Sequence, residues 1–150
     1  MNKELAVAAL EYGTVIDHIP SSALFKCVEL LGLEACPSAV TIGNNLPSRH
    51  LGTKGIIKVA DTVFAPEVIN RIAIVAPTAV VNVIKDYEVV EKNRVQLPDE
   101  VVGLVKCTNP KCVSCHEPMA TRFNVVSREP VTLKCRYCEH EYAGDKIVLR

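Results

Sequence analysis

The chain has 150 residues, a length close to the boundary between one compact domain and two. Almost half of the residues are apolar (49%), and 17 basic residues balance 17 acidic ones. This composition predicts a folded protein, and the balanced charge provides no global field toward nucleic acid or an anionic membrane. Residues 1–10 lack the features of a signal peptide, and the longest apolar stretch, residues 72–84, is interrupted and too short to span a bilayer. We therefore expect a cytoplasmic protein without nucleic-acid or membrane partners.

The first predicted domain covers residues 1–97 and alternates strand and helix patterns. A helix is expected over residues 24–31, because apolar residues recur there at the spacing i, i+3, i+4, i+7 and Gly32 provides a stop. Pro66 can begin a second helix, which ends at Pro77. Runs of β-branched and apolar residues predict strands at residues 5–10, 14–19, 39–42, 55–60, 79–84 and 87–90, with a turn-rich segment at 43–53. This order predicts an α+β fold, a ferredoxin-like antiparallel sheet with two helices on one face.

A second domain, residues 98–150, follows a polar, proline-containing linker at residues 93–100. Five of the seven cysteines lie in this domain, at positions 107, 112, 115, 135 and 138. Cytosolic thiols stay reduced, so such a cluster indicates a metal site rather than disulfides. Few large apolar side chains accompany the cysteines, so we expect a small all-β domain that folds around one structural Zn²⁺ ion.

Two cysteine pairs at short spacing can each hold one edge of a tetrahedral ion. Cys135-x2-Cys138 supplies one pair, and Cys107-x4-Cys112 supplies the other. The spacing Cys112-x2-Cys115 is also normal for a zinc ribbon, and His116 and His140 are spare candidates. Spacing alone therefore leaves the fourth ligand open between Cys107 and Cys115.

Polar residues interrupt three of the apolar strands of the first domain. Lys58, Asn82 and Lys92 are the interruptions. Asp17 and His18 adjoin on the first clear strand and are expected on opposite faces if that strand is regular. A polar residue in an apolar strand costs free energy unless it faces water or a partner. The pattern fits either the wet face of a one-sided sheet or a pocket in which lysine and histidine meet phosphates and aspartate meets a ribose hydroxyl. No Walker loop, G-x-G-x-x-G or H-E-x-x-H motif is present.

Several segments in order carry a resemblance to a known family. They are Gly13-Thr14-Val15-Ile16-Asp17-His18-Ile19-Pro20, Asn45-Leu46-Pro47-Ser48, Ile57-Lys58, Val81-Asn82, Tyr87-Glu88-Val89-Val90 and the cysteine pairs. Together, and essentially from end to end, they resemble the regulatory chain of bacterial aspartate carbamoyltransferase.

The resemblance implies a subunit of pyrimidine biosynthesis that has no active site of its own. Such a chain forms a regulatory dimer through its N-terminal domain and joins catalytic trimers through its zinc domain, two catalytic trimers with three regulatory dimers. It binds CTP as an inhibitor, assisted by UTP, and ATP as an activator. The implied zinc ligands are Cys107, Cys112, Cys135 and Cys138. The implied effector pocket uses Val15, Asp17, His18, Lys58, Asn82, Ile84, Tyr87, Val89 and Lys92.

The resemblance also implies individual roles. Lys92 and His18 would meet the triphosphate, Lys58 and Asp17 the ribose and base edge, and main-chain groups near Ile84 and Tyr87 the amino side of the base. Ala8 stands where relatives can carry an acidic residue, which affects nucleotide preference. Docking to the catalytic chain would involve Asn109, Glu117, Tyr137 and Glu139.

Two competing hypotheses concern the second domain. A nucleic-acid-binding zinc ribbon predicts a basic face bearing aromatic residues, for which Phe123, Tyr137 and Tyr142 are available. A thiol-based catalyst would use Cys115 beside His116. Alkylation of Cys115 without loss of zinc or of effector response would discard the catalyst.

Overall fold

The computed structural model describes residues 9–150, which form two compact units, one ending at Gln96 and the other spanning Leu97–Arg150. The boundary lies one residue before the position expected from the linker. Most of the strand predicted at residues 5–10 lies outside the described residues, and the described part, Ala9 and Leu10, is not in a strand.

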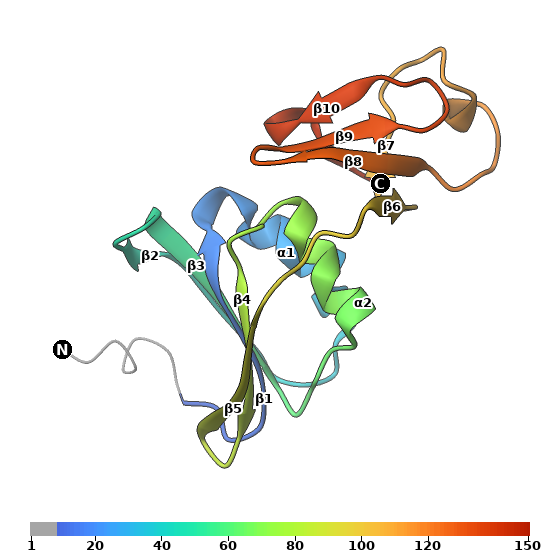
Figure 1. The fold of residues 1–150 in the computed structure, drawn as a ribbon. Coiled ribbons are helices and arrows are strands. Elements are labelled where there is room, and N and C mark those ends of the chain that lie inside the picture. The colour runs from blue at the N-terminus through green and yellow to red at the C-terminus, as the bar shows by residue number, and fades with distance from the viewer. Residues whose placement is uncertain (1–8) are drawn as a thin grey trace. The chain divides into compact units, whose positions relative to one another are not determined.

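The first unit is an antiparallel sheet covered on one face by helices (Figure 1). Its strands are β1 (Gly13–Pro20), β2 (Val40–Ser48), β3 (Gly52–Ala60), β4 (Val80–Lys85) and β5 (Glu88–Arg94), in the order β2-β3-β1-β4-β5. The helices are α1 (Leu24–Leu30) and α2 (Pro66–Ile69), with 3₁₀ turns at Ser21–Ala23, Leu33–Ala35 and Asn70–Ile74. The connection β1-α1-β2-β3-α2-β4 is ferredoxin-like, so the predicted α+β class is confirmed.

The core of this unit lies between the helices and one face of the sheet. Ile16 and Ile19 of β1 and Ile57 of β3 are fully buried, and so are Leu24 and Cys27 of α1. Side chains of a strand alternate between its two faces, so neighbouring residues of the same strands face away from the helices. That second face carries the polar interruptions noted in the sequence.

The prediction of a turn-rich segment at residues 43–53 is wrong, because most of these residues lie in strands β2 and β3. The turn-forming residues of this segment are accommodated by local irregularity. The pairing register shifts between Gly43 and Leu46, where Asn45 adopts a φ of 58°. Pro47 lies on β2, which is at the edge of the sheet, where a missing N–H need not break a ladder.

The second predicted helix is present, but its α-helical part is shorter than predicted. It starts at Pro66 as expected, yet it is α-helical only to Ile69 and continues as a 3₁₀ helix over Asn70–Ile74. β-Branched side chains are frequent in this segment and lower helix propensity. Ile69, Ile72 and Ala73 are still buried, so the apolar face of this segment packs into the core.

The second unit consists of short strands and two 3₁₀ turns. Its strands are β6 (Glu100–Val102), β7 (Val105–Lys106), β8 (Arg122–Arg128), β9 (Val131–Cys135), β10 (Glu141–Ala143) and β11 (Val148–Leu149). Four form a sheet in the order β10-β9-β8-β6, and β7 pairs with β11. Phe123 and Leu133 are fully buried at its centre. Among the described residues of the chain, no helix is long and apolar enough to cross a membrane.

Candidate ligand pocket and metal centre

The sheet register brings the polar interruptions of three strands into one row. Lys58 of β3 lies opposite Val15 of β1, Val15 lies opposite Asn82 of β4, and Asn82 lies opposite Lys92 of β5. Residues directly opposite each other in an antiparallel pair share a face of the sheet. The row therefore lies on the face away from the helices, although its ends are 34 positions apart in sequence.

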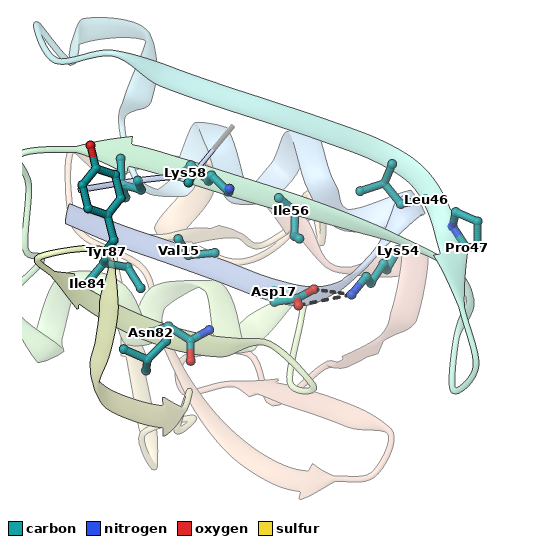
Figure 2. A pocket seen from close by; sticks show the side chains of 13 residues that line it. Val15, Asp17, Leu46, Pro47, Lys54, Ile56, Lys58, Asn82, Ile84 and Tyr87 are labelled. Carbon is teal, nitrogen blue, oxygen red and sulfur yellow. Dashed lines mark hydrogen bonds and ion pairs between the residues drawn. The ribbon is translucent and has the colours of Figure 1, made fainter. Parts of the chain in front are cut away.

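A cavity of about 590 Å³ opens over this row (Figure 2). Seven of the nine predicted pocket residues line it, namely Val15, Asp17, Lys58, Asn82, Ile84, Tyr87 and Val89. His18 and Lys92 are not among its lining residues. The volume is within the range of small-molecule sites, which is about 300 to 1,000 Å³.

The cavity also contains an ion pair that the sequence analysis missed. Lys54 Nζ lies 2.8 Å from Asp17 Oδ1 and 3.1 Å from Oδ2 (Figure 2). Lys54, Ile56 and Lys58 alternate along β3 and all line the cavity. The period of two in a strand is the signal for this set, because it places Lys54 and Ile56 on the same face as Lys58.

Leu46 and Pro47 of β2 were missed as well, because their segment was expected to be a turn. They lie on one side of the cavity, and Tyr87 lies on the other (Figure 2). The remaining lining residues outside the prediction are Ala9 and Leu10, which precede β1. The hairpin positions therefore supply walls to an otherwise open sheet face.

His18 lies in an irregular part of β1. Its φ is 57°, and the β1–β3 register shifts between Ile16 and Ile19. The His18 N–H donates to Asp17 Oδ1 at 2.6 Å, and its carbonyl accepts from the Thr78 hydroxyl at 2.9 Å. The expectation that His18 and Asp17 lie on opposite faces assumed a regular strand, which this bulge breaks.

The turn between β4 and β5 is fixed against the start of β1. Asp86 and Tyr87 both have positive φ, 52° and 65°, as in a type I′ hairpin. The Tyr12 hydroxyl donates to Asp86 Oδ1 at 2.8 Å, and the Tyr87 N–H donates to the Glu11 carbonyl at 3.2 Å. The hydrogen bond to the Asp86 carboxylate also raises the pKa of Tyr12. These contacts fix the β4–β5 turn, which places Tyr87 at the cavity.

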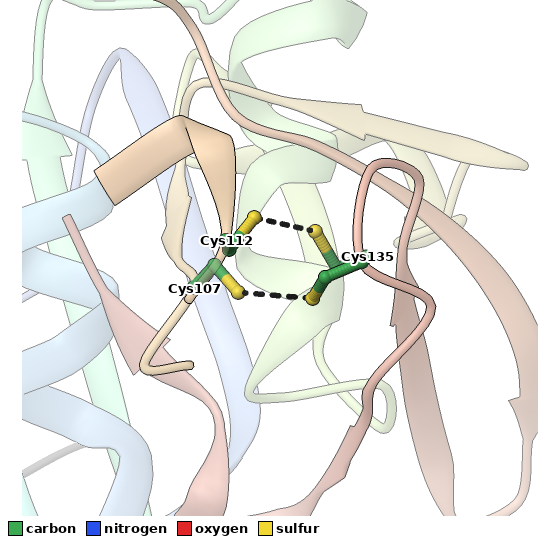
Figure 3. A group of neighbouring side chains, drawn as sticks. Cys107, Cys112 and Cys135 are labelled. Carbon is green, nitrogen blue, oxygen red and sulfur yellow. Dashed lines mark hydrogen bonds between the residues drawn. The ribbon is translucent and has the colours of Figure 1, made fainter. Parts of the chain in front are cut away.

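In the second unit, four cysteines gather their sulfurs at one point. The Sγ atoms of Cys107, Cys112, Cys135 and Cys138 all lie within 4.8 Å of one another. The Sγ separation is 3.6 Å for Cys107–Cys138 and 3.7 Å for Cys112–Cys135 (Figure 3). A tetrahedral ion with sulfur ligands at about 2.3 Å requires sulfur separations of about 3.8 Å. The four side chains therefore fit a tetrahedral thiolate site.

Cys115 lies outside this cluster. Its thiol donates to the carbonyl oxygens of Cys107 and Asn109, at 3.2 and 3.1 Å. The structure thus groups Cys107, and not Cys115, with the other three sulfurs. His116 hydrogen-bonds through Nε2 to the Pro110 carbonyl and is not part of the cluster.

Burial and hydrogen bonds shift the pKa values of Cys107, Cys135 and Cys138. Burial raises the pKa of Cys107 to about 12 and also raises that of Cys135. Burial acts in the same direction on Cys138, but hydrogen bonds from the Asn109 side chain and the His140 backbone outweigh it and lower that pKa to about 6. A metal ion bound by all four sulfurs would displace the remaining protons.

Comparison with known proteins places both units in one family. Residues 5–96 match the profile described as aspartate carbamoyltransferase regulatory chain, allosteric domain, and residues 99–148 match the metal binding domain of the same chain. The chain belongs to the aspartate carbamoyltransferase regulatory chain family. The predicted resemblance is thereby confirmed.

Aspartate carbamoyltransferase regulatory chains from distant organisms align with almost the whole sequence. That of Parabacteroides distasonis is 55% identical over 148 residues, covering 99% of this chain and 96% of the relative. That of Porphyromonas gingivalis is 54% identical, covering 98% and 97%. That of Thermococcus gammatolerans is 48% identical, covering 97% of each chain.

Membership in this family fixes the general role. The chain is a regulatory, non-catalytic subunit with an allosteric domain and a metal-binding domain, and it associates with the catalytic chain of the same enzyme. The hypothesis of a thiol-based catalyst at Cys115 is therefore wrong.

Proposed function

We propose that this chain is the subunit through which CTP, UTP and ATP control aspartate carbamoyltransferase in cytoplasmic pyrimidine biosynthesis. Residues 1–97 would bind the nucleotides, with CTP inhibiting, UTP assisting CTP, and ATP activating. Residues 98–150 would hold one Zn²⁺ ion and link the catalytic trimers. The observation that carries the proposal is the cavity over the Lys58–Val15–Asn82–Lys92 row, in a domain of the allosteric type.

The composition of the cavity suits a nucleotide. Val15, Ile56 and Ile84 supply apolar surface for a base, and Asn82 adds an amide that can both donate and accept hydrogen bonds. Lys58 can donate hydrogen bonds to the ribose and base edge, and Lys54 adds positive charge beside Asp17.

Two assigned residues lie beside the cavity rather than in its lining. Lys92 pairs with Asn82 at the end of the row, and its long side chain can reach a phosphate that extends past the cavity. His18 is half-buried on β1, next to Asp17. Both residues belong to the proposed site, and the Lys92→Ala variant tests the role of Lys92 directly.

Zinc is the proposed ion because of the donor set. Four thiolates favour a soft or borderline cation, and a closed tetrahedral site is typical of structural rather than catalytic zinc. Bound zinc would supply the charge that keeps the buried thiolates together. Cys107, Cys112, Cys135 and Cys138 would be its ligands, in residues 98–150.

The proposed assembly has two catalytic trimers joined by three regulatory dimers. Asn109, Glu117, Tyr137 and Glu139 lie in or beside the two cysteine loops, and we assign docking to these residues. An effector changes the enzyme only by binding one quaternary state better than the other, a difference worth about 1 to 3 kcal/mol in typical allosteric proteins. CTP would favour the state with low affinity for aspartate, and ATP the state with high affinity.

Isothermal titration calorimetry of the zinc-loaded chain with CTP and then ATP tests the nucleotide site. The two nucleotides should compete. Lys58→Ala and Lys92→Ala should each weaken binding about tenfold, which corresponds to about 1.4 kcal/mol. Lys26→Ala is the matched control, because Lys26 belongs to α1, on the opposite face of the sheet.

The outcomes separate the parts of the proposal. Weakening by Lys58→Ala alone would confine the site to the cavity and remove Lys92 from it. Nucleotide binding unaffected by either variant would refute the site. A reconstituted holoenzyme whose aspartate saturation curve ignores both nucleotides would refute the regulatory effect.

A further inference from the structure

The metal centre is contacted by a buried phenol that no cysteine pattern indicates. Tyr142 belongs to β10 and is only 8% exposed. Its hydroxyl oxygen lies 3.4 Å from Cys107 Sγ, within hydrogen-bond range for sulfur. The Cys107 side chain is itself 1% exposed, so water has little access to this sulfur.

The position of the Tyr142 ring is set by two packing relations. The ring meets Phe123 of β8 edge to face, with centroids 6.1 Å apart and planes at 69°. Tyr142 also pairs with Leu133 of β9, the strand that ends at Cys135. The hydroxyl is therefore held by the same sheet that carries a proposed metal ligand.

The direction of the hydrogen bond follows from the chemistry of a metal-bound sulfur. A ligating thiolate has no proton, so it can only accept, and the Tyr142 hydroxyl must be the donor.

Such a donor matters because of the charge of the centre. Four thiolates around a divalent cation leave about two excess negative charges, and buried charge is costly unless hydrogen bonds compensate it. We propose that Tyr142 is a positioning residue of the metal centre, which donates to the Cys107 thiolate, holds it in ligand geometry and increases metal affinity. This inference rests on the proposed four-cysteine metal site.

A second hydroxyl near the centre provides an internal comparison. Ser114 Oγ lies 3.1 Å from Cys112 Sγ, but Ser114 is only partly buried and is two residues away in sequence. Water can replace the hydroxyl of a partly exposed serine more readily than that of a buried tyrosine. Loss of the Tyr142 hydroxyl should therefore weaken metal binding more than loss of the Ser114 hydroxyl.

The test compares Tyr142→Phe with Tyr137→Phe and Ser114→Ala in the full regulatory chain, without the catalytic chain. Tyr137 lies between Cys135 and Cys138, and within the described residues its hydroxyl makes no hydrogen bond. Tyr137→Phe is therefore the matched control, because it also removes a phenol hydroxyl but no hydrogen bond. Zinc affinity is measured by competition with a chromophoric chelator. Tyr142→Phe should reduce it about 10- to 100-fold, as outer-shell changes do at other sites. Tyr137→Phe should leave it within about twofold.

A spectroscopic readout separates a hydrogen bond from simple packing. In the Co²⁺-substituted protein, the thiolate-to-cobalt charge-transfer band should shift to lower energy in Tyr142→Phe, because the sulfur loses a donor. The phenylalanine ring keeps the contact with Phe123, so packing alone would leave the band unchanged. If Tyr142→Phe does not fold, incorporation of 3-fluorotyrosine, a stronger donor of the same shape, should raise the metal affinity of the wild-type chain.

The results also separate this inference from the metal site itself. A wild-type chain that bound no metal would refute the site. A wild-type chain that bound metal, with Tyr142→Phe folded and unchanged in both affinity and cobalt spectrum, would overturn the role of Tyr142 alone. If 3-fluorotyrosine is used instead, a metal affinity equal to that of the unmodified chain would also overturn the role of Tyr142.

Discussion

Gly13 is the position in the first unit where adding a single methyl group should destabilise the fold the most. It lies in β1, the central strand, opposite Ala60 on one side and Ile84 on the other. Its φ is 138°, a conformation that L residues rarely adopt. A Cβ atom there would overlap the Val59 carbonyl oxygen.

The size of the effect follows from what would have to move. The obstructing atom belongs to the backbone of β3, so no side-chain rotation can relieve the contact. Overpacking costs about 1 to 3 kcal/mol and a strained φ about 1 to 3 kcal/mol more. We expect Gly13→Ala to lower the free energy of unfolding by about 4 kcal/mol. A displaced β1 would also move Val15 and Asp17, and it should therefore weaken the proposed nucleotide binding.

Gly32→Ala is the matched control, because Gly32 also has a positive φ, 65°, but no atom lies within 4 Å of its would-be Cβ. Its cost should be only the left-handed penalty, about 1 to 2 kcal/mol. Urea unfolding of the full, metal-loaded chain, followed by far-ultraviolet circular dichroism, measures both. A Gly13→Ala variant no less stable than Gly32→Ala would refute the steric argument.

Two further predictions concern the cysteines. Burial raises the pKa of the Cys27 thiol from 9.0 to about 12, so the stability it contributes is fully present below about pH 9 and is lost as the pH rises toward 12. The loss should approach about 4 kcal/mol. In urea unfolding at several alkaline pH values, the free energy of unfolding should fall less steeply with pH in Cys27→Ala than in the wild-type chain. Equal pH dependence in the two proteins would contradict the prediction. Removing the metal with a chelator should unfold residues 97–150 and leave the β1–β5 sheet intact, because a unit this small depends on its metal. Amide NMR spectra report each unit separately, and a full set of dispersed signals from residues 97–150 after chelation would contradict it.

The parts of the fold predicted best from sequence were those specified by local spacing. Helix α1 follows from apolar residues that recur every three or four positions, and Leu24 and Cys27 are buried as that spacing requires. The cysteine spacing likewise predicted the cluster, since each short pair can converge on one ion without knowledge of the remaining fold. Spacing did not decide whether Cys107 or Cys115 is the fourth ligand, because that choice depends on where the loop between them turns.

The errors came from residues whose local preference is overruled by pairing between strands. Asn45 and Pro47 are turn formers, yet they lie within β2 because a bulge absorbs the first and the sheet edge tolerates the second. His18 adopts a positive φ inside β1, which no alternation rule anticipates. Lys54 was missed for a different reason, since its role depends on a partner, Asp17, 37 residues away.

The choice between a wet sheet face and a ligand pocket illustrates why sequence alone stops short of function. Both hypotheses place Lys58 and Asn82 on the same side of their strands, so alternation cannot separate them. The two hypotheses differ in whether side chains from neighbouring segments enclose that face. Leu46 and Pro47 come from one edge of the sheet and Tyr87 from a turn near the other, and together they enclose the row as walls of a cavity. The binding function proposed for this face therefore depends as much on two hairpins as on the charged residues between them.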